Sequence, residues 1–496
     1  MTEVRTEAGM WIEHRRVGAS GDEKMTVENP ATEEIIACVP RAQAADVAVA
    51  VEAARRAQPG WRRLPGLDKA KLLHEIATRI RSMRRELAEV MTLEGGKPMI
   101  ENLDEIEWTA ACFDYYAEVG RHSRGNAIPP SFEHQVNFTV KEPFGVVVAI
   151  VPFNYPLLLM AWKVAPALAA GNAVIIKPAE ETPLATLELA RAFETLPPGV
   201  AGIVTGVGEE AGEALVTHRH VDMVAFTGAT ATGKRIMRLA SDSLKKVNLE
   251  TSGIDPFIVC EDVDLDVAAR GAVWARYLNA GQVCTSAKRF YVVEAIADAF
   301  VQRFVELAGQ ITVGDPRRPE TDMGPVISGE ALARVMQSID RATREGARLA
   351  TGGSRPKGLD RGHYLEPTVL DQVRHGSSAT REEVFGPVAA IVRVRDVDEA
   401  IALANDSDYG LGANIYTNNL RYVMKAMEEV KAGTFWVNDP LTDNEAGPFG
   451  GMRQSGIGRE LGEEGLDAFR EPKHVHIDYV QERKNYWFPY ADRAWE

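Results

Sequence analysis

Short apolar segments that alternate with helical segments constrain the fold of this chain more than any other feature. Four of them have the length of a buried strand: GVVVAIV (145–151), AVIIKP (173–178), GIVTGV (202–207) and VDMVAFTG (221–228). The stretches between them carry apolar residues at three- and four-residue spacing, as amphipathic helices do. Because parallel strands joined by crossover helices form a doubly wound sheet, the pattern predicts an α/β fold.

A second series of the same kind begins near residue 253. It contains the segments PFIVC (256–260), RFYVVE (289–294), VAAIVRV (388–394) and GTFWVND (433–439), with helical stretches between them. A helix-rich layer, from about residue 46 to 118, precedes the first series. We therefore predict two doubly wound, Rossmann-like α/β domains, one from residues 1–122 and 144–252 and the other from residues 253–454.

Two further segments fit neither sheet. HQVNFTVKEP (134–143) and HVHIDYV (474–480) alternate apolar and polar residues with the period of a half-buried strand. Exposed strand edges are usually covered, and a second subunit is one way to cover them. We therefore expect residues 123–143 and 470–496 to form a small β arm that bridges the subunits of a homodimer or homotetramer. The aromatic tail YWFPY (486–490) is expected to pack on a neighbouring subunit.

Composition and charge exclude several classes of protein. Of 496 residues, 45% are hydrophobic and 26% charged, which is ordinary for globular domains. The net charge of −15 would repel phosphate groups, so nucleic acid and anionic membranes are poor partners. One uncharged stretch, 145–162, is long enough to span a membrane, but Pro152, Asn154 and Pro156 favour a strand, a loop and a helix. The N-terminal residues lack the features of a targeting signal, so we expect a cytoplasmic protein.

The metal-ligating residue types show no chelating pattern. The four cysteines, Cys38, Cys112, Cys260 and Cys284, are far apart and form no CxxC pair, which argues against disulfides and thiolate zinc sites. None of the ten histidines stands in an HxxxH or similar spacing. We therefore expect no metal site and a reducing compartment.

The glycine-rich segment GATATGK (228–234) closely resembles a phosphate-binding P-loop, because it follows a strand and opens a helix. A P-loop continues with a Ser or Thr that holds magnesium, whereas this chain continues with Arg235. Two interpretations remain: a helix N-terminus that binds an anionic ligand, or a tight structural turn. The glycines Gly206, Gly208 and Gly212 match only half of a dinucleotide-binding fingerprint.

Three ionisable positions are candidates for chemistry. Cys284 lies among small residues that leave room for a ligand, although a buried and inert thiol is the commoner situation. Glu250 ends the segment KKVNLE beside a flexible turn, where it could be a solvated carboxylate or a general base. Lys177 and Glu180 follow a predicted strand at its carboxyl end, where parallel sheets bind ligands.

Together, these pieces resemble the aldehyde dehydrogenase superfamily in order and spacing along nearly the whole chain. The resemblance is carried by PFNYP (152–156), KPAE (177–180), FTG (226–228), LE (249–250), GQVC (281–284), EEVFGP (382–387), PFGG (448–451) and SG (455–456).

The resemblance implies roles for the three catalytic candidates. Cys284 would attack the aldehyde carbon, and the Asn154 amide with the backbone N–H of Cys284 would hold the resulting oxyanion. Glu250 would deprotonate the water that hydrolyses the thioester. The acylating branch of the family lacks this base, so a free acid is the expected product.

The resemblance also implies a nicotinamide cofactor held by the first domain, with NAD preferred and NADP possible. A carboxylate at Glu180 accepts ribose hydroxyl groups and repels a 2′-phosphate. The implied cofactor-binding residues are Lys177, Glu180, Gly228, Gly233, Glu383, Phe385 and Phe153. Two positions depart from the usual pattern, because Ala229 stands where many members have Ser and Thr251-Ser252 replaces Leu-Gly after the base.

The aldehyde tunnel of the family corresponds here to six mostly aromatic or apolar positions: Trp108, Tyr155, Trp162, Leu278, Asp443 and Phe449. Vertebrate succinate-semialdehyde enzymes carry arginines at two of them, and Thr285 and Ser286 leave no disulfide partner just after the nucleophile. We therefore favour an uncharged aromatic or medium aliphatic aldehyde. The carboxylate of Asp443 keeps a hydroxy-, amino- or semialdehyde open. A P-loop-like nucleotide-binding protein and a catalytically silent relative are less favoured hypotheses.

Overall fold

In the computed structural model, residues 9–122 and 124–490 are described, and two α/β units follow one another along the chain. The first is built on an eight-stranded sheet with the order β2-β1-β9-β8-β7-β10-β11-β21. Its central strands are parallel. The strands are β1 (Met10–Ile12), β2 (Arg15–Val17), β7 (Val146–Ile150), β8 (Ala173–Lys177), β9 (Ala201–Ile203), β10 (Met223–Thr227), β11 (Lys246–Glu250) and β21 (Gly456–Ile457).

Successive residues of the central strands pack on opposite faces of this sheet, as the β pleat requires. Val147 and Ala149 enter one core cluster, whereas Val146 and Val148 enter another. Both faces are therefore covered, which explains why these strands are continuous apolar runs. The helices are α1 (Ala44–Arg63), α2 (Gly66–Ser82), α3 (Arg84–Gly95), α4 (Met99–Arg121), α5 (Pro156–Ala170), α6 (Leu184–Leu189), α7 (Glu213–Thr217) and α8 (Thr230–Ser241).

The second unit has a seven-stranded sheet with the order β14-β15-β16-β13-β12-β18-β19, in which only β14 is antiparallel to its neighbour. Its strands are β12 (Asp255–Val259), β13 (Ala287–Val293), β14 (Arg348–Thr351), β15 (Thr368–Asp371), β16 (Val388–Val394), β18 (Gly412–Tyr416) and β19 (Thr434–Val437). Its helices are α9 (Leu265–Tyr277), α10 (Glu294–Ala308), α11 (Gly329–Arg344), α12 (Ser378–Arg381), α13 (Val397–Asn405) and α14 (Leu420–Glu429).

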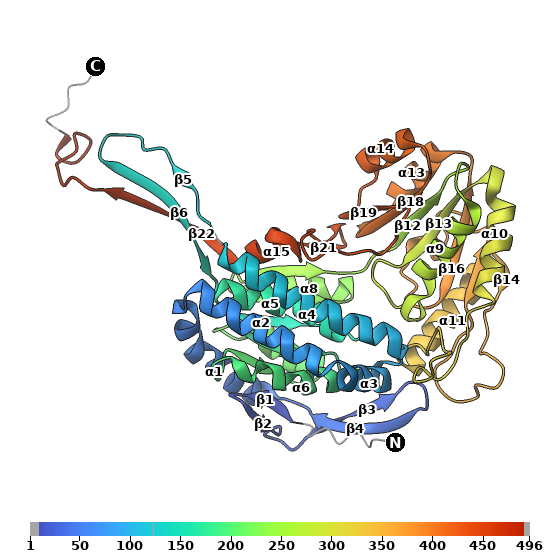
Figure 1. Ribbon diagram of the computed structural model, residues 1–496, viewed down its shortest axis with the longest axis horizontal. Coiled ribbons are helices and arrows are strands. Elements are labelled where there is room, and N and C mark those ends of the chain that lie inside the picture. Colours follow the sequence, from blue (N-terminus) through green and yellow to red (C-terminus); the bar gives the residue numbers. More distant parts are fainter. Residues whose placement is uncertain (1–8, 123, 491–496) are drawn as a thin grey trace.

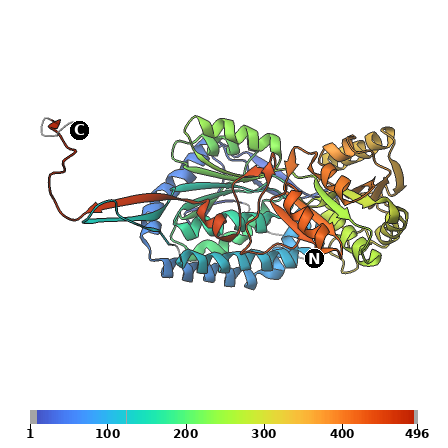
Figure 2. The same cartoon turned by 90° about the horizontal axis from the view of Figure 1, so that it is seen from above.

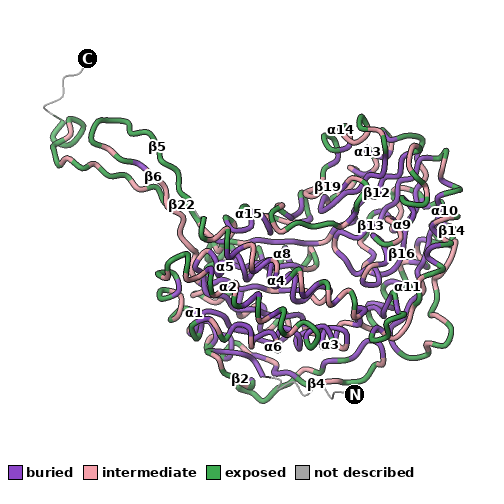
Figure 3. The backbone as a smooth tube through the Cα atoms, viewed as in Figure 1, coloured by how far each residue is buried: buried purple, intermediate pink, exposed green. Residues whose placement is uncertain are grey.

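A three-stranded arm projects from the first unit, as Figures 1 and 2 show. Its strands are β5 (Ala127–Ile128), β6 (Gln135–Pro143) and β22 (Arg470–Asp478), and β6 pairs along its whole length with β22. The arm is largely exposed (Figure 3). The apolar side chains of Val136, Ile477 and Tyr479 are 47%, 43% and 64% exposed, so they lack the cover that such side chains normally have.

Short elements complete the structure. The hairpin of β3 (Lys24–Asn29) and β4 (Glu34–Pro40) reaches the second unit, where the backbone N–H of His363 donates to the carbonyl of Pro30. Strand β17 (Tyr409–Gly410) pairs with β20 (Met452–Arg453), and α15 (Gly462–Asp467) leads into β22.

The predicted fold class is confirmed: two parallel α/β sheets and a small β arm. The proposed division at residues 252 and 253 falls in the loop between β11, in the first sheet, and β12, in the second. Parts of the segments 1–122, 123–143 and 470–496 lie outside the described residues. The uncharged stretch 145–162 forms β7, a turn and the start of α5. Within the described residues, no helix is long and apolar enough to cross a membrane.

Some elements differ from the predictions. Strand β9 ends at Ile203, so the second half of the predicted strand GIVTGV is a loop. This loop contains Gly206, whose φ of +155° favours glycine, and an added Cβ would meet the Ala211 Cβ at 2.7 Å. Strands β15 and β18, of four and five residues, were not predicted either.

Candidate active site

The candidate catalytic groups meet where the two sheets face each other. Glu250 is the last residue of β11, and Cys284 lies in the loop that leads into β13. Asn154 lies in the turn between β7 and α5. Glu250 and Asn154 thus lie at or just after the carboxyl ends of β11 and β7, where doubly wound sheets bind ligands, whereas Cys284 precedes its strand.

The loop that carries Cys284 has an unusual backbone. Three successive residues, Asn279, Ala280 and Gly281, have φ values of +49°, +53° and +73°. A Cβ at Gly281 would lie 2.4 Å from the carbonyl oxygen of Gly386, so this close approach requires glycine. The nucleophile loop, residues 279–286, therefore lies directly against residues 382–388, which we call the cofactor loop.

A buried arginine holds these two loops together. The fully buried guanidinium of Arg276 donates to the carbonyl oxygens of Gly386, Val384 (2.9 Å) and Val388 (2.6 Å). It also donates to the hydroxyl of Ser286 at 2.6 Å. Since its partners are uncharged, burial lowers the pKa of Arg276 to about 10.

The Cys284 side chain is partly accessible, and it lines a cavity. Burial and the neighbouring carboxylates of Glu250, Asp255 and Glu383 raise the pKa of its thiol, while the ammonium of Lys288 acts in the opposite direction. A thiol in this environment needs a cation or a base before it can act as a nucleophile.

Glu250 is buried with only 3% of its surface exposed. Among the described residues, neither of its carboxylate oxygens has a hydrogen-bond partner of normal geometry, although its charge couples to the Cys284 thiol. Burial and the charge of Glu460 raise the pKa of Glu250 to about 8. Unpaired buried carboxylates are costly and concentrate at functional sites, so Glu250 is suited to take up a proton.

The turn after Glu250 is tied down in spite of its unusual residues. The Thr251 hydroxyl donates to the carbonyl of Gln454 at 2.6 Å, and the Ser455 hydroxyl donates to the carbonyl of Ser252 at 2.8 Å. Behind Glu250, the fully buried Lys163 ammonium lies 2.7 Å from the Glu460 carboxylate.

Asn154 presents its side-chain amide next to the nucleophile loop. Its Nδ2 donates to the carbonyl of Gln282 at 3.0 Å, and this amide keeps a second N–H for a ligand. The backbone carbonyl of Asn154 accepts from Asn279 Nδ2 and from Lys97 Nζ, each at 3.2 Å. Lys97 is itself paired with the buried carboxylate of Glu105. These contacts hold Asn154 in place, as a fixed oxyanion-binding donor requires.

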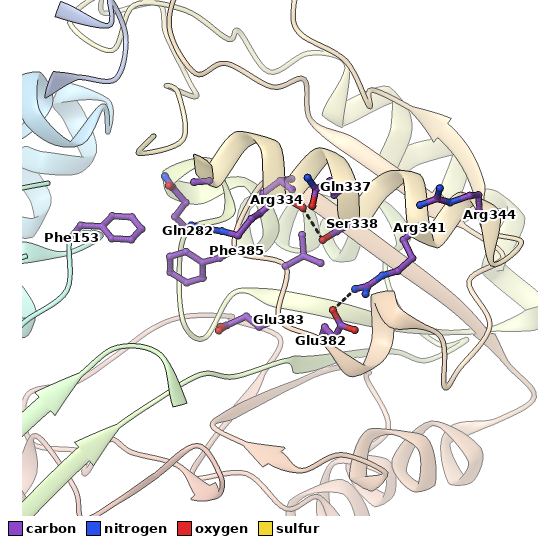
Figure 4. Close-up of a pocket in the computed structure, with 13 residues that line it drawn as sticks. Phe153, Gln282, Arg334, Gln337, Ser338, Arg341, Arg344, Glu382, Glu383 and Phe385 are labelled. Atoms are coloured by element: carbon purple, nitrogen blue, oxygen red, sulfur yellow. Dashed lines mark hydrogen bonds and ion pairs between the residues drawn. The ribbon is translucent and has the colours of Figure 1, made fainter. Parts of the chain in front are cut away.

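The predicted nicotinamide residues line one cavity of about 610 Å³. Phe153 and Phe385 both line it (Figure 4), and their rings pack edge to face with centroids 5.9 Å apart. Glu383 also lines it, and helix α11 supplies Arg334 and Arg341. The hydrophobic rings suit a planar ligand, whereas the two arginines are paired with the carboxylates of Glu330 and Glu382.

The remaining cofactor candidates lie along the first sheet. Lys177 Nζ and Glu180 Oε1 are 3.1 Å apart, and Gly208 lies against the same carboxylate. Gly228 lies at the start of α8 and Gly233 in its first turns. The N-cap residue Ala229 makes no side-chain hydrogen bond, so the first N–H groups of α8 remain available to a ligand.

The P-loop-like segment is not arranged as a P-loop. Lys234 Nζ donates to Gln454 Oε1 at 2.6 Å, and Arg235 forms an ion pair with Glu213. Lys234, the residue that would bind phosphate in a P-loop, is therefore already hydrogen-bonded to another side chain.

A second cavity, of about 230 Å³, opens on the Cys284 thiol. The aromatic rings of Trp162 and Phe449 pack at 4.8 Å in its wall. All six residues predicted for an aldehyde tunnel line this cavity: Trp108, Tyr155, Trp162, Leu278, Asp443 and Phe449.

Among the residues of this cavity that were not predicted from the sequence, Trp274 and Glu445 bear most on its chemistry. Trp274 is on α9, four residues before Leu278, so the helical period could have indicated it. Glu445 lies two residues after Asp443 in an irregular loop, where no period could indicate it. Desolvation by the surrounding protein and the charge of Glu445 raise the pKa of the Asp443 carboxyl to about 7.

No group of three or more His, Cys, Asp or Glu side chains in the described part of the chain could hold a metal ion.

The family model of the aldehyde dehydrogenases matches residues 17–475, so this chain belongs to the aldehyde dehydrogenase family. It is 41% identical over 475 residues to aminoaldehyde dehydrogenase 1, peroxisomal, of Malus domestica, and 42% identical over 475 residues to betaine aldehyde dehydrogenase 1 of Oryza sativa subsp. japonica. In both cases the match covers 94% of each chain.

Solved structures agree with this assignment. Betaine aldehyde dehydrogenase from Staphylococcus aureus, solved with NAD⁺, is 35% identical with a TM-score of 0.95, covering 98% of this chain and 97% of that one. An NADP-dependent enzyme from E. coli is 35% identical with a TM-score of 0.93, covering 95% and 98%. The recognition of the superfamily from sequence motifs is thereby confirmed.

The close approach at Gly281 gives a testable prediction. In Gly281→Ala, a residue with a Cβ would have to adopt a positive φ and would collide with the Gly386 carbonyl. The substitution should therefore lower the free energy of unfolding by about 2–4 kcal/mol. It should also displace the nucleophile loop. Gly346→Ala is the matched control, because Gly346 has a φ of +104° with nothing within 4 Å of an added Cβ, and should cost only about 1 kcal/mol. Denaturant unfolding measures both, and equal losses would contradict the contact.

Proposed function

We propose that this protein oxidises an aldehyde that carries a cationic amino or trimethylammonium group to the free acid, with NAD or NADP as hydride acceptor. The observation that carries the proposal is the position of Cys284 in the wall of an aromatic cavity that also contains two carboxylates, Asp443 and Glu445. Glu250 and Asn154 approach the same thiol or its loop. The proposal takes these residues in the roles that the family resemblance implies.

Cys284 begins the reaction as a thiolate, after its proton has passed to water. The sulfur attacks the aldehyde carbon, and the carbonyl oxygen becomes an oxyanion that the Asn154 amide and the Cys284 N–H stabilise. The nicotinamide group supplies the hydride acceptor, so the carbon is oxidised to a thioester on Cys284.

Glu250 serves the hydrolysis that follows. Its carboxylate takes a proton from water, the resulting hydroxide attacks the thioester carbon, and the C–S bond breaks to release the acid and the Cys284 thiolate. A pKa of about 8 suits a base that must both accept and release protons near neutral pH. The Lys163–Glu460 pair lies behind this carboxylate.

The residues present fit a dinucleotide. The rings of Phe153 and Phe385, with the Glu383 carboxylate, would hold the nicotinamide riboside, and Lys177 with Glu180 would hold the adenine ribose. The uncapped N-terminus of α8, between Gly228 and Gly233, suits the pyrophosphate. We propose NAD as the preferred cofactor, because the Glu180 carboxylate would repel a 2′-phosphate.

The aldehyde cavity supports a cationic substrate. Electron-rich faces of Trp and Tyr attract ammonium groups, and Trp108, Tyr155, Trp162 and Trp274 all line this cavity. Asp443 and Glu445 add negative charge. The curated relatives named above act, by their names, on aminoaldehydes and betaine aldehyde. They support an amino-aldehyde substrate better than the uncharged aromatic or aliphatic aldehyde that the sequence favoured. The sequence-based choice gave too little weight to negative charge in the cavity, because Glu445 was not predicted to line it.

A P-loop nucleotide-binding protein and a catalytically silent relative agree less well with the structure. The occupied Lys234 argues against a P-loop nucleotide site, and the clustering of Cys284, Glu250 and Asn154 argues against a silent relative. A cytoplasmic location stays a prediction, since one of the plant relatives is named peroxisomal and another chloroplastic.

The assigned role of Glu250 predicts the kinetics of Glu250→Gln. This variant should release a burst of NADH equal to its active sites, because hydride transfer needs no base, and then stall at the thioester. Its steady-state rate should fall at least about 100-fold. In the unchanged protein that rate should rise as the pH passes upward through about 8, where Glu250 loses its proton. Stopped-flow NADH absorbance measures the burst and the steady-state rate. Cys284→Ala is the control, because it should show no burst. A wild-type steady-state rate in Glu250→Gln would remove the residue from this role.

The cationic substrate is tested with a matched pair of aldehydes. Betaine aldehyde and its carbon isostere 3,3-dimethylbutanal differ only in the positive charge. The ratio of their kcat/KM values should exceed about 10, and Asp443→Asn should reduce it several-fold. The ratio should fall as the pH drops through about 7, because the Asp443 carboxylate becomes protonated. The protonation of Glu250 changes the kcat/KM values of both aldehydes by the same factor, so it cancels in their ratio. A ratio near one at pH 8 would contradict a cationic substrate.

We also propose that the arm assembles the subunits into a homodimer or homotetramer, because its exposed apolar residues lack cover in one chain. Ile477→Asp should disrupt that contact and produce a smaller species in light scattering coupled to size-exclusion chromatography. Leu244→Asp is the control, because Leu244 is equally apolar and 89% exposed but lies outside the arm. An unchanged mass for Ile477→Asp, or a monomeric unchanged protein, would contradict the proposal.

A further inference from the structure

Lys288 is a buried cation that no step of the proposed reaction uses. It lies on β13, four residues after Cys284, and its side chain is only 3% exposed. Taking an ammonium group out of water is costly unless it is paired and hydrogen-bonded. The contacts of the Lys288 ammonium therefore indicate the role of its positive charge.

The Lys288 ammonium joins three segments of the site. It donates to the backbone carbonyls of Val283 at 2.9 Å and Cys284 at 2.6 Å, in the nucleophile loop. It also lies 3.3 Å from Oε1 of Glu383, in the cofactor loop. The same oxygen of Glu383 accepts from the backbone N–H of Gly253, between the two sheets. One ammonium group thus connects the backbone of the nucleophile to the carboxylate assigned to the nicotinamide ribose.

The charges that surround Cys284 are mostly negative. Glu250 approaches from β11, Asp255 from β12 and Glu383 from the cofactor loop, and each disfavours a thiolate. Asp255 is buried, and one of its carboxylate oxygens has no partner among the described residues. On the side of the aldehyde cavity, the titratable groups are Tyr155, Asp443 and Glu445. The Lys288 ammonium counteracts these groups at the sulfur.

Positioning the backbone of the cofactor loop does not require Lys288. Arg276 already holds the carbonyls of Val384, Gly386 and Val388, and it also binds Ser286 in the nucleophile loop. What Lys288 adds is a contact to the Glu383 carboxylate and a positive charge beside the Cys284 backbone.

We propose that Lys288 is a positioning residue of the reaction. It orients Glu383 toward the cofactor, and its positive charge favours the thiolate form of Cys284. This inference rests on the proposed function, because it takes Cys284 as the nucleophile. The proton released from the thiol passes to water, and Lys288 takes no part in proton transfer. Its contribution is electrostatic and geometric, so it should show in the pH dependence of thiol reactivity without any substrate.

The test measures alkylation of Cys284 by iodoacetamide between pH 6 and 10, followed by peptide mass spectrometry. The background is Cys38→Ser, because Cys38 is exposed, whereas Cys112 and Cys260 are buried. Lys288→Met should raise the apparent pKa of Cys284 by about one unit and slow its alkylation at pH 7 about tenfold. Lys288→Gln keeps a hydrogen-bond donor without the charge and should show the same shift. Lys288→Arg keeps the charge and should stay close to the unchanged protein.

Arg289→Met is the matched control. Arg289 is the next residue of β13, is also buried, and donates to the carbonyls of Ile254 at 2.6 Å and Ala404 at 3.2 Å, away from the nucleophile loop. Its loss removes a buried cation and its hydrogen bonds from the same strand. The pH dependence of Cys284 alkylation should nevertheless stay unchanged. If Lys288→Met does not fold, Lys288→Gln decides the question.

Steady-state kinetics provide the second readout. Lys288→Gln should raise the KM for NAD several-fold because Glu383 loses its positively charged partner, and should lower kcat at pH 7 more than at pH 9. An unshifted alkylation profile in both neutral variants, or an equal shift in Arg289→Met, would overturn the inference. Those outcomes differ from failure of the proposed function, in which the unchanged protein oxidises no aldehyde or Cys284→Ala remains active.

Discussion

The contact between the nucleophile loop and the cofactor loop is the constraint on which the rest of this site depends. Gly281 can approach the Gly386 carbonyl only because it lacks a Cβ, and Arg276 then satisfies the carbonyls that this approach leaves buried. The sulfur of Cys284 and the ring of Phe385 are therefore fixed by one packing arrangement within the second domain. The first domain contributes Glu250 and Asn154 from the ends of its own strands. Hydride transfer needs atoms placed to within a fraction of an ångström, and a backbone contact of this kind can provide that precision.

Electrostatics explain why so many acidic groups are tolerated around one thiol. Desolvation raises the pKa values of the buried Glu250 and Asp255 to about 8 and 7, so these carboxyl groups change protonation near neutral pH. Each desolvated carboxylate costs stability when it is charged, and in an enzyme this cost is offset by function. Glu250 would use the raised pKa to exchange protons with water. Asp443, in the wall of the aldehyde cavity, would use its charge to attract a cation.

Much of this molecule could be predicted from the sequence, because its signals are local. Buried parallel strands are apolar runs, so β7, β8, β10, β12, β13 and β16 stand out, and Cys284 and Glu250 lie in short motifs. The elements that were missed depend on distant neighbours. Strand β18 is five residues long and acquires its place only between β12 and β19. Trp274 and Glu445 become cavity residues only when α9 and the loop at 441–446 are brought together.

Lys288 and Arg276 show the limit of sequence reasoning most clearly. Both are long cationic side chains of a type that is usually exposed, and nothing in their neighbourhood predicts burial. They are buried because backbone carbonyls of two irregular segments need donors. Lys288 serves Val283 and Cys284, just after the left-handed turn at 279–281, and Arg276 serves Val384 and Gly386 in the cofactor loop. These four residues lie outside helices and strands, so side chains supply the donors. The irregular backbone that carries the Cys284 sulfur thus requires cations beside it, so catalytic geometry and electrostatic activation have a common structural origin.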